Sequence, residues 1–507
     1  MVTEDDELAR TRPSQPTPVP LADLADWLAR HGGVSTEGDL ATVVTGVSLS
    51  SRRIRRGDLY AALPGQRAHG IDFVADAVAA GAVAVLTDPA GADRLPDVPA
   101  LVVPEPRRVL GRLAAHVYGD PASALKLVGI TGTQGKTTAT RLAEGGLQTA
   151  GITAAVVGTV GTRIAGEDVK TALTTPEAPD LHGLFALMVE RGVAACAMEV
   201  SSHALVMGRV DGVVFDVAVF TNLGRDHLDF HHDVEDYYAA KASLFTPERA
   251  RRALVNVDDA HGRRLATETT LPVRTFSSGG ADADWRATDI ELTATGSRFI
   301  VRGPEGVEVA AGVALPGDFN VSNALAAVAA CAEVGFDPAA VAQGIAAGAG
   351  VPGRLERIEA GQDFVVVVDY AHKPDAVEAA LGSLRPLTTG RLIVVLGAGG
   401  ERDPGKRPLM GEIAGRLADV LVVTDDNPRG EDPAAIRAAI LAGTRDATAE
   451  VIEIGDRRTA IREALRRART DDIVLVAGKG HETGQEISGE VHPFDDRDVV
   501  HEELSAR

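Results

Sequence analysis

The sequence predicts an α/β protein of three domains, and three observations support this fold class. Short apolar runs recur along the chain, and stretches of helical periodicity separate them. One run leads into a glycine-rich turn and then into a helix. The 507 residues exceed what one hydrophobic core usually holds. We place an N-terminal α/β domain at 21–124, a central domain with a mostly parallel sheet at 125–353 and a C-terminal α/β domain at 354–507.

The composition indicates large cores and an acidic surface. Apolar residues make up 45% of the chain, and the formal net charge is −21. Nucleic acid and anionic membranes attract basic surfaces, so neither is expected as a partner. No apolar run reaches the length of a membrane span. The only cysteines, Cys196 and Cys331, lie in apolar runs and form no disulfide or zinc pattern.

The beginning of the sequence gives no sign of export. Residues 1–7 are acidic where a secretory signal would be basic, and prolines follow as far as Pro20. Because acidic residues and prolines favour disorder, we expect residues 1–20 to be a disordered tail. We expect a soluble cytoplasmic enzyme, whose buried thiols stay reduced.

The segment at 21–124 is expected to be a small α/β unit. Helices are predicted at 21–31 and at 75–80, where Gly81 ends the second one. Residues 43–49 are expected to start a series of short strands and helices that runs to about residue 120, and a strand is predicted at 82–86. The polar stretches between them read, on their own, as ordinary loops.

The central segment opens on Val128-Gly-Ile-Thr-Gly-Thr-Gln-Gly-Lys-Thr-Thr138, between a predicted buried strand and a predicted helix. Its glycines, Gly132 and Gly135, let backbone N–H groups face a phosphate. Lys136 would add a cation for the outer phosphates, and Thr137 is placed to bind magnesium.

This stretch departs from the general phosphate-loop pattern. The pattern has a glycine five residues before Gly135, where this chain has Ile130. A tight turn that carries a solvated lysine is therefore the alternative. The strand-to-helix junction favours the phosphate loop, and ATP binding is the working hypothesis.

Further buried strands are predicted at 194–200, 214–220 and 252–257, in a parallel sheet covered on both faces. Ligands bind beyond the carboxyl ends of such strands. Polar residues stand at these ends, in Glu199-Val-Ser-Ser-His203 and in Thr221-Asn-Leu-Gly-Arg-Asp-His-Leu-Asp-Phe-His231.

The C-terminal segment repeats this arrangement after Gly353-Arg-Leu-Glu356. Strands are predicted at 364–368, 392–396, 420–423 and 473–476, with helices between them such as 433–441. Each strand leads into a polar cluster, and the four clusters predict one binding edge: Asp369-Tyr-Ala-His-Lys-Pro374, Gly397-Ala-Gly-Gly-Glu-Arg-Asp403, Thr424-Asp-Asp-Asn-Pro-Arg429 and Gly478-Lys-Gly-His-Glu482.

Several side chains in these clusters have two interpretations from residue type alone. Magnesium prefers oxygen ligands, which suits Thr137 and Glu199 better than His227, and a structural histidine is an equal alternative there. Lys241 follows Asp236-Tyr-Tyr-Ala-Ala240 and reads as a solvated helical lysine. Three arginines at turns or strand ends could clamp phosphate or carboxylate, or could be structural: Arg354, Arg402 and Arg429.

The combination of motifs resembles the Mur ligase family over roughly residues 43–495. Six motifs occur in the order of that family: Gly132-Thr-Gln-Gly-Lys-Thr-Thr138, Glu199-Val-Ser-Ser-His203, Asn222 to His231, Gly317-Asp-Phe-Asn-Val-Ser-Asn323, Asp369-Tyr-Ala-His372 and Asp426-Asn-Pro-Arg429. The resemblance implies a uridine-nucleotide domain, a P-loop ATPase-like central domain and a Rossmann-like C-terminal domain. It is strongest to members that make the UDP-N-acetylmuramoyl tripeptide with meso-diaminopimelate.

This resemblance also implies a reaction in peptidoglycan precursor synthesis. UDP-N-acetylmuramoyl-L-alanyl-D-glutamate would be phosphorylated by ATP on its glutamate side chain, and an amine would attack the acyl phosphate. ATP and Mg²⁺ would be required, because aligning and neutralising the phosphate are the main catalytic tasks. Lys136, Glu199, His227 and Lys241 are the implied catalytic residues.

The residues that the resemblance assigns fall into four groups. The implied ATP site comprises Gly132, Thr133, Gln134, Gly135, Lys136, Thr137, Thr138, Asn323, Arg354, Asp369 and His372. The implied UDP-substrate site comprises Leu49, Ser51, Gln66, Arg67, Ala68, Thr174, Thr175, Ser201 and Arg209. The implied diaminopimelate site comprises Arg402, Asp426, Asn427, Pro428, Arg429, Gly478 and Glu482. The implied metal ligands are Thr137, Glu199, His227 and Lys241 as a carbamate.

Three alternatives stay open from the sequence. Lysine-adding relatives differ at the position of Arg429, whose guanidinium would grip the second carboxylate of diaminopimelate. A folylpolyglutamate synthetase-like ligase is disfavoured by the N-terminal α/β unit and by Asp426-Asn-Pro-Arg429. The third alternative is a nucleotide-binding protein without catalysis. Oligomeric state is open, with a monomer as the expectation. At Leu173 and Met207 some members of the family have a polar residue, so a polar substrate contact at these two positions is in question.

Overall fold

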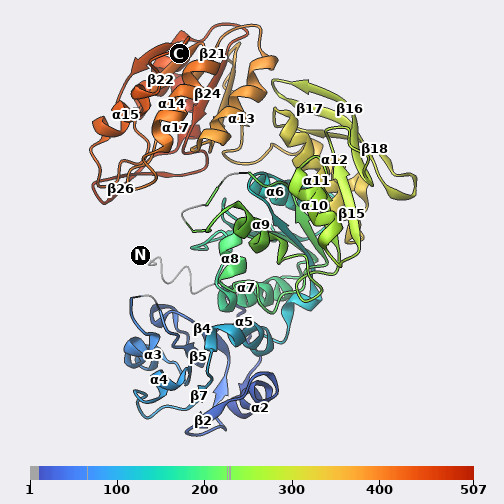
Figure 1. The fold of residues 1–507 in the computed structure, drawn as a ribbon, viewed down its shortest axis with the longest axis vertical. Coiled ribbons are helices and arrows are strands. Elements are labelled where there is room, and N and C mark those ends of the chain that lie inside the picture. The colour runs from blue at the N-terminus through green and yellow to red at the C-terminus, as the bar shows by residue number, and fades with distance from the viewer. Residues whose placement is uncertain (1–10, 66, 225, 228–229) are drawn as a thin grey trace. The chain divides into compact units, whose positions relative to one another are not determined.

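The computed structural model describes residues 11–65, 67–224, 226–227 and 230–507. It divides into two compact units. The first contains the described residues up to 286, together with 302–307 and 325–344, and the second contains 287–301, 308–324 and 345–507. Each unit is α/β, as predicted (Figure 1). The three domain boundaries set from the sequence remain a prediction.

The N-terminal part of the first unit is built on a five-stranded sheet of order β2-β7-β6-β5-β4. Its strands are β2 (Ser35–Glu37), β4 (Gly46–Ser48), β5 (Asp58–Ala61), β6 (Ala84–Thr87) and β7 (Ala100–Val102). Apolar residues of α2 (Leu21–His31) and α5 (Pro106–Val117) pack with Leu59, while α3 (Val74–Ala80) packs with its neighbour Tyr60. Since successive strand residues face opposite sides, the helices cover both faces. The short helix α4 (Pro89–Ala92) follows β6.

Residues 11–20 correct the prediction of a disordered tail, although residues 1–10 lie outside the described residues. Arg12 and Asp58 form an ion pair of 2.7 Å in which both side chains are buried. The backbone N–H of Ser14 donates to Glu190, and β1 (Val19–Pro20) pairs with β3 (Val43–Val44). Composition indicated disorder because it does not reveal such long-range partners for a proline-rich segment.

The largest sheet has eleven strands in the order β11-β10-β9-β12-β8-β13-β14-β15-β16-β17-β18. Seven of them are parallel neighbours: β9 (Ala154–Val157), β12 (Ala195–Glu199), β8 (Lys126–Thr131), β13 (Val217–Phe220), β14 (Ala253–Asn256), β15 (Val273–Ser277) and β16 (Trp285–Thr293). The others are β10 (Thr162–Ile164), β11 (Glu167–Val169), β17 (Gly296–Arg302) and β18 (Glu308–Val313). The strands predicted at 194–200 and 214–220 correspond to β12 and β13, which flank β8 on its two sides.

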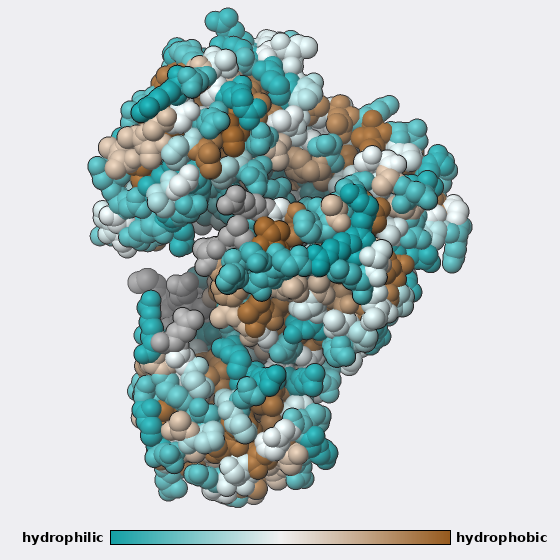
Figure 2. Space-filling model, viewed as in Figure 1, coloured by the Kyte–Doolittle hydropathy of each residue, from teal (hydrophilic) through white to brown (hydrophobic). Residues whose placement is uncertain are grey.

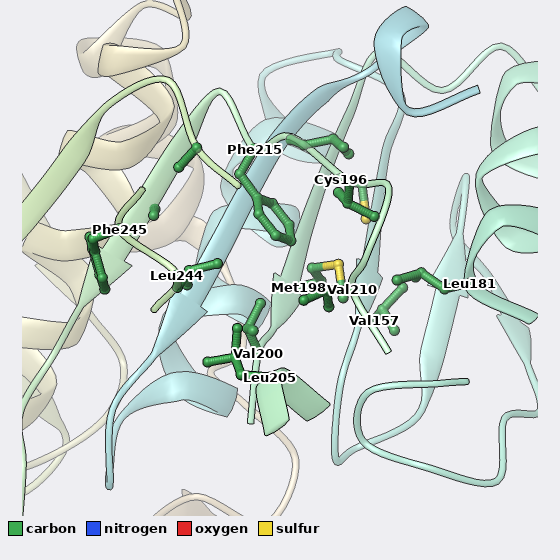
Figure 3. Close-up of a cluster of buried hydrophobic side chains, with 14 of the residues drawn as sticks. Val157, Leu181, Cys196, Met198, Val200, Leu205, Val210, Phe215, Leu244 and Phe245 are labelled. Atoms are coloured by element: carbon green, nitrogen blue, oxygen red, sulfur yellow. The ribbon is translucent and has the colours of Figure 1, made fainter. Parts of the chain in front are cut away.

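The helices of this region follow the strands in sequence. They are α6 (Lys136–Thr149), α7 (Ala178–Glu190), α8 (Ser202–Val206), α9 (Val234–Ala242), α10 (Ala260–Glu268), α11 (Asp318–Glu333) and α12 (Pro338–Ala347). Figure 3 shows part of the core, where Cys196 and Met198 of β12 lie in one cluster with Leu181 of α7 and Phe215. Both cysteines are buried, and burial raises the pKa of Cys331 to about 12.

The second unit contains a six-stranded sheet of order β19-β20-β24-β21-β22-β23. Its strands are β19 (Glu356–Arg357), β20 (Val365–Asp369), β21 (Leu392–Leu396), β22 (Val420–Val423), β23 (Glu450–Glu453) and β24 (Ile473–Ala477). One core contains α13 (Pro374–Leu384), α14 (Lys406–Leu417) and α15 (Pro433–Ala442), and the other contains α16 (Arg457–Arg467) and α17 (Asp496–Ser505). A hairpin of β25 (Gly484–Ile487) and β26 (Glu490–Pro493) lies between β24 and α17 in the chain.

The described surface carries hydrophobic residues mainly in small groups among hydrophilic ones, on the face shown in Figure 2. None of the described helices has the length and hydropathy that a transmembrane span requires.

His182 of α7 makes the first unit sensitive to acid. Its ring is completely buried, with Nε2 3.1 Å from the carbonyl oxygen of Asp211, and burial lowers its pKa from 6.5 to about 4. The unfolded chain therefore binds a proton below pH 6.5 that the folded chain excludes down to pH 4. Stability from this residue is fully present above pH 6.5 and is lost as the pH falls towards 4.

We predict that His182→Gln reduces the loss of unfolding free energy between pH 7 and pH 4 by about 3 kcal/mol, the value of a pKa shift of this size. Urea unfolding at the two pH values measures it. His232→Gln is the control, because the His232 side chain is 94% exposed. An equal acid sensitivity in the His182 variant and in the unchanged chain would contradict the prediction.

Candidate active site

The glycine loop connects β8 to α6 and is held by the end of β13. Gly132 and Gly135 have φ angles of +151° and +86°, which few other residues adopt. The hydroxyl of Thr221 donates to the carbonyl of Gln134 at 2.7 Å, and the side chain of Asn222 accepts from the Gln134 N–H at 2.9 Å. A Cβ at Gly132 would collide with the Thr221 hydroxyl. The loop is thus a rigid turn at the N-terminus of α6, the geometry expected for binding phosphate.

Two lysines meet at the carbonyl oxygen of Gly132. Lys136 Nζ donates to it at 2.8 Å and Lys241 Nζ at 2.9 Å. Lys241 is only 1% exposed, and its ammonium lies 4.4 Å from the centroid of the Tyr237 ring. The interpretation of Lys241 as a solvated lysine is therefore wrong. Two cations around one oxygen repel each other, so this place favours a nearby anion.

Glu199 ends β12 next to the start of the loop, since it pairs with Ile130 of β8. The carboxylate is 1% exposed and accepts hydrogen bonds from the N–H of Thr159 at 2.7 Å and from its hydroxyl at 3.1 Å. The Thr159 hydroxyl lies 3.2 Å from that of Thr174. These bonds fix the direction of the Glu199 carboxylate, and its oxygens keep further lone pairs with which they can bind a ligand.

The oxygen donors in this region suit magnesium. Thr137 lies in the first turn of α6 and Glu199 on the neighbouring strand. Among the described residues, no group of three or more His, Cys, Asp or Glu could hold a metal ion by itself. An ion here would need hydroxyl, phosphate or water ligands beside Glu199, which is the coordination that magnesium accepts.

His227 lies close to other aromatic residues, although Arg225, Leu228 and Asp229 of the same predicted motif lie outside the described residues. It has a φ angle of +53°, and its Nε2 is 3.4 Å from Asp226. Its ring centroid is 6.0 Å from that of Tyr237, the ring that also contacts Lys241. The structure thus brings His227 and Lys241 to one aromatic ring, and their metal ligation remains a prediction.

Of the predicted UDP-substrate residues, one group surrounds the end of β12. Thr175 donates to the backbone oxygen of Glu199 at 2.9 Å, and the Ser201 N–H donates to Thr175 at 3.3 Å. Arg209 donates to Glu177 at 2.8 Å and contacts the sulfur of Met207. Leu173 is 39% exposed and Met207 37% exposed, so both present apolar surface here.

The other group follows two adjacent strands of the N-terminal sheet. Leu49 and Ser51 come after β4, and the exposed Arg67 and Ala68 come after β5. Parallel pairing of β4 with β5 brings these loops to the same sheet edge. Gln66 lies outside the described residues.

Three of the predicted nucleotide residues lie together in the second unit. The Asp369 carboxylate accepts from the N–H groups of Leu355 and Ala371, and burial raises its pKa. Arg354 lies over the Tyr370 ring at 4.8 Å. Burial lowers the pKa of His372 to about 4, so its ring is neutral at pH 7. Asn323, on α11 of the same unit, donates to Asn320 at 3.2 Å.

The predicted amino-acid residues lie beyond the carboxyl ends of β22 and β24. Asn427 donates to Glu482 at 2.8 Å and accepts from the ammonium of Lys479 at 2.9 Å. Arg429 donates to Glu486 at 3.1 Å and to the carbonyl of Gly400 at 2.7 Å. Pro428 lies between them in the chain, and Arg402 is exposed in the loop after β21.

Asp426 differs from these paired residues. It is 7% exposed, and its Oδ2 is buried with no hydrogen-bond partner among the residues that the structure describes. A buried, unpartnered carboxylate oxygen is costly, so it favours a donor from a ligand. Gly478 lies against it, since a Cβ there would collide with Asp426 Oδ2.

Sequence reasoning missed several residues that shape these sites. Thr159 orients Glu199, and Lys479 orients Asn427 and Glu482 from a completely buried position. Lys479 had a visible signal, because it lies inside the polar cluster Gly478-Lys-Gly-His-Glu482. Thr159 had none beyond its place after an apolar run.

Three family models match the chain. "Mur ligase family, catalytic domain" matches residues 43–118, "Mur ligase middle domain" matches 130–331, and "Mur ligase, glutamate ligase domain" matches 353–480.

Curated proteins and solved structures agree with these models. The UDP-N-acetylmuramoyl-L-alanyl-D-glutamate--2,6-diaminopimelate ligase of Streptomyces coelicolor is 55% identical and covers 97% of this chain and 99% of its own length. The protein of the same name from Corynebacterium glutamicum is 49% identical, over 96% of this chain and 97% of its own. A solved structure with that name is 32% identical, has a TM-score of 0.69 and covers 97% of this chain and 99% of its own.

Proposed function

The chain belongs to the Mur ligase family, and we propose that it is the ligase that adds meso-diaminopimelate to UDP-N-acetylmuramoyl-L-alanyl-D-glutamate in peptidoglycan precursor synthesis. The names of the full-length relatives support this substrate pair. The observation in the structure that carries it is the combination of Arg429 with the unpartnered Asp426 oxygen. An acceptor with an ammonium group and an additional carboxylate suits this pair of charges.

The chemistry proceeds in two steps that need no nucleophilic side chain. The glutamate side-chain carboxylate attacks the γ-phosphorus of ATP, so a P–O bond forms and ADP leaves. The amine of diaminopimelate then attacks the acyl carbon, and phosphate leaves as the amide forms. The protein has to align the groups and neutralise the charge in transfer, for which Lys136 at the N-terminus of α6 is placed.

The donor set of the loop suits a magnesium ion with ATP. Thr137 and Glu199 would hold it, and the ion would supply neutralisation of phosphate charge. The hydrogen bonds from Thr159 would keep the Glu199 carboxylate pointed in one direction. We propose that the reaction takes place in the cytoplasm, where ATP is available.

Carbamylation of Lys241 would relieve the crowding of two ammonium groups at the Gly132 carbonyl. The carbamate would replace the cation with an anion that could pair with Lys136. Its oxygen atoms, together with His227, would be the protein's ligands for a second metal ion.

Acceptor recognition would use opposite charges at two positions. Arg429 would hold the distal carboxylate of diaminopimelate. The guanidinium fork of an arginine matches a carboxylate better than the ammonium group of a lysine would. Asp426 Oδ2 would accept a hydrogen bond from the acceptor's ammonium group. L-lysine lacks the second carboxylate, so it would leave Arg429 with no acceptor group to bind.

The first test is a ligation assay with ATP, Mg²⁺ and the UDP-muramoyl dipeptide, in which product mass distinguishes meso-diaminopimelate from L-lysine. We expect tripeptide product only with diaminopimelate. Product with L-lysine would identify the lysine-adding type, and product with a folate substrate would identify the folylpolyglutamate type. ATP binding without ligation would leave a non-catalytic protein.

Replacing Arg429 by alanine should raise the KM for diaminopimelate by about 100-fold, because a charge-assisted, two-pronged contact is lost. ATP binding, measured by calorimetry, should be unchanged. Arg416→Ala is the matched control, since Arg416 forms an exposed ion pair with Glu378 in the same unit. An unchanged KM for diaminopimelate in the Arg429 variant would refute this role.

Replacing Lys241 by alanine should abolish ligation, with partial rescue by millimolar acetate or formate in place of the carbamate. The rescue distinguishes a lost carboxylate-like ligand from a lost ammonium, which a short-chain amine would replace instead. Mass spectrometry of the intact unchanged protein under bicarbonate should detect the added carbamate. Full activity of the variant without any added acid would rule out the carbamate.

A further inference from the structure

Arg457 and Asp496 form a completely buried ion pair in the second unit. Arg457 is the first residue of α16 and Asp496 is the first residue of α17. The guanidinium donates from Nε to Asp496 Oδ1 and from Nη2 to Oδ2, both at 2.7 Å, and both side chains are 0% exposed. The contact is therefore two-pronged and excluded from water.

The same guanidinium also binds two backbone carbonyls at the edge of the sheet. Nη2 donates to the carbonyl of Ala477 at 3.0 Å, and Nη1 donates to that of Asp425 at 3.3 Å. Ala477 is the last residue of β24, directly before Gly478, and Asp425 directly precedes Asp426. Arg457 thus binds the chain immediately before two residues of the proposed diaminopimelate site.

The backbone ladder of the sheet does not join these two loops directly. In the strand order, β21 lies between β24 and β22, so the ladder of hydrogen bonds does not join those two strands to each other. Their loops nevertheless approach closely, because a Cβ at Gly478 would collide with Asp426 Oδ2. Side chains further along also join the two loops, since Lys479 donates to Asn427 and Gln485 donates to the carbonyl of Asp426. Arg457 is the group that binds the backbone of both loops where they leave their strands.

The energetics favour a positioning role over a purely stabilising one. Removing two charges from water is costly, and well-packed apolar residues of similar volume often stabilise a fold as well or better. Only an arginine offers several donors in fixed directions, which this place uses for one carboxylate and two carbonyls. A lysine would keep the charge but would bind as a single point.

We propose that Arg457, anchored by Asp496, is a positioning residue for the amino-acid acceptor. It contacts no substrate and acts by holding the Asp426 loop and the Gly478 loop at the separation that the acceptor requires. This inference rests on the proposed function.

The test replaces Arg457 by lysine in the full chain and measures steady-state kinetics for each substrate in turn. We expect the KM for meso-diaminopimelate to rise by about tenfold or more, whereas the KM for ATP stays within about twofold, because only acceptor binding depends on this spacing. Thermal unfolding shows whether the variant is folded.

Arg391→Lys is the matched control. Arg391 also donates to a buried aspartate, Asp472, in the same sheet, but these residues precede β21 and β24 at the opposite edge. We expect this control to change the melting temperature without a selective change in the diaminopimelate KM. An equal selective rise in both variants would overturn the proposal.

Asp496→Asn provides a second variant if Arg457→Lys does not fold. It retains Arg457 and its two carbonyl contacts but removes the charge that anchors the guanidinium, so a smaller selective rise in the diaminopimelate KM is expected. A folded variant with an unaltered diaminopimelate KM would overturn the inference, as would parallel rises for diaminopimelate and ATP. Failure of the proposed function looks different, because the unchanged chain would then form no diaminopimelate product.

Discussion

The parallel pairing of β8 with β12 and β13 is the constraint on which the first unit depends. This pairing brings the ends of three strands to one edge, where Glu199 stands on one side of the glycine loop and Thr221 on the other. Thr221 and Asn222 hold the loop from the end of β13, and Lys136 donates to the carbonyls of Gly132 and Thr133. The sheet therefore places Glu199 and Thr221, helices α6 and α9 place Lys136 and Lys241, and the loop supplies the backbone N–H groups.

The strands and the order of their polar ends were predictable because a parallel sheet buried on both faces leaves a plain signal in sequence. Runs such as Leu392–Leu396 and Val420–Val423 match the observed strands residue for residue. Register then aligns their ends, since Leu396 pairs with both Val423 and Ala477. The assignment of these polar residues to particular binding sites came from the family motifs. From residue type alone, a polar residue at a strand end has a structural and a functional interpretation of equal weight.

What the sequence could not reveal are contacts between residues far apart in the chain. Lys241 looks like a surface lysine until its partner is known, and that partner, Gly132, is 109 residues away. Residues 11–20 looked disordered for the same reason, since Arg12 finds Asp58 46 residues later. Thr159 is 40 residues from Glu199, and Arg457 is 39 residues from Asp496. Neither composition nor periodicity contains these pairings, because both describe only local chain.

The buried charges of the second unit indicate how the proposed choice of amino-acid acceptor can arise. Arg457 is neutralised by Asp496, and Lys479 is shared by Asn427 and Glu482, so these buried cations are already satisfied. Asp426 retains an oxygen without a partner among the described residues, and Arg429 binds the partly exposed Glu486 and the carbonyl of Gly400. A ligand therefore meets Asp426, which favours a hydrogen-bond donor, and Arg429, which can exchange the Glu486 carboxylate for a carboxylate of the ligand. In the proposed site, selectivity would follow from the charges that are left incompletely paired, since unpaired charges discriminate far more strongly than apolar contacts do.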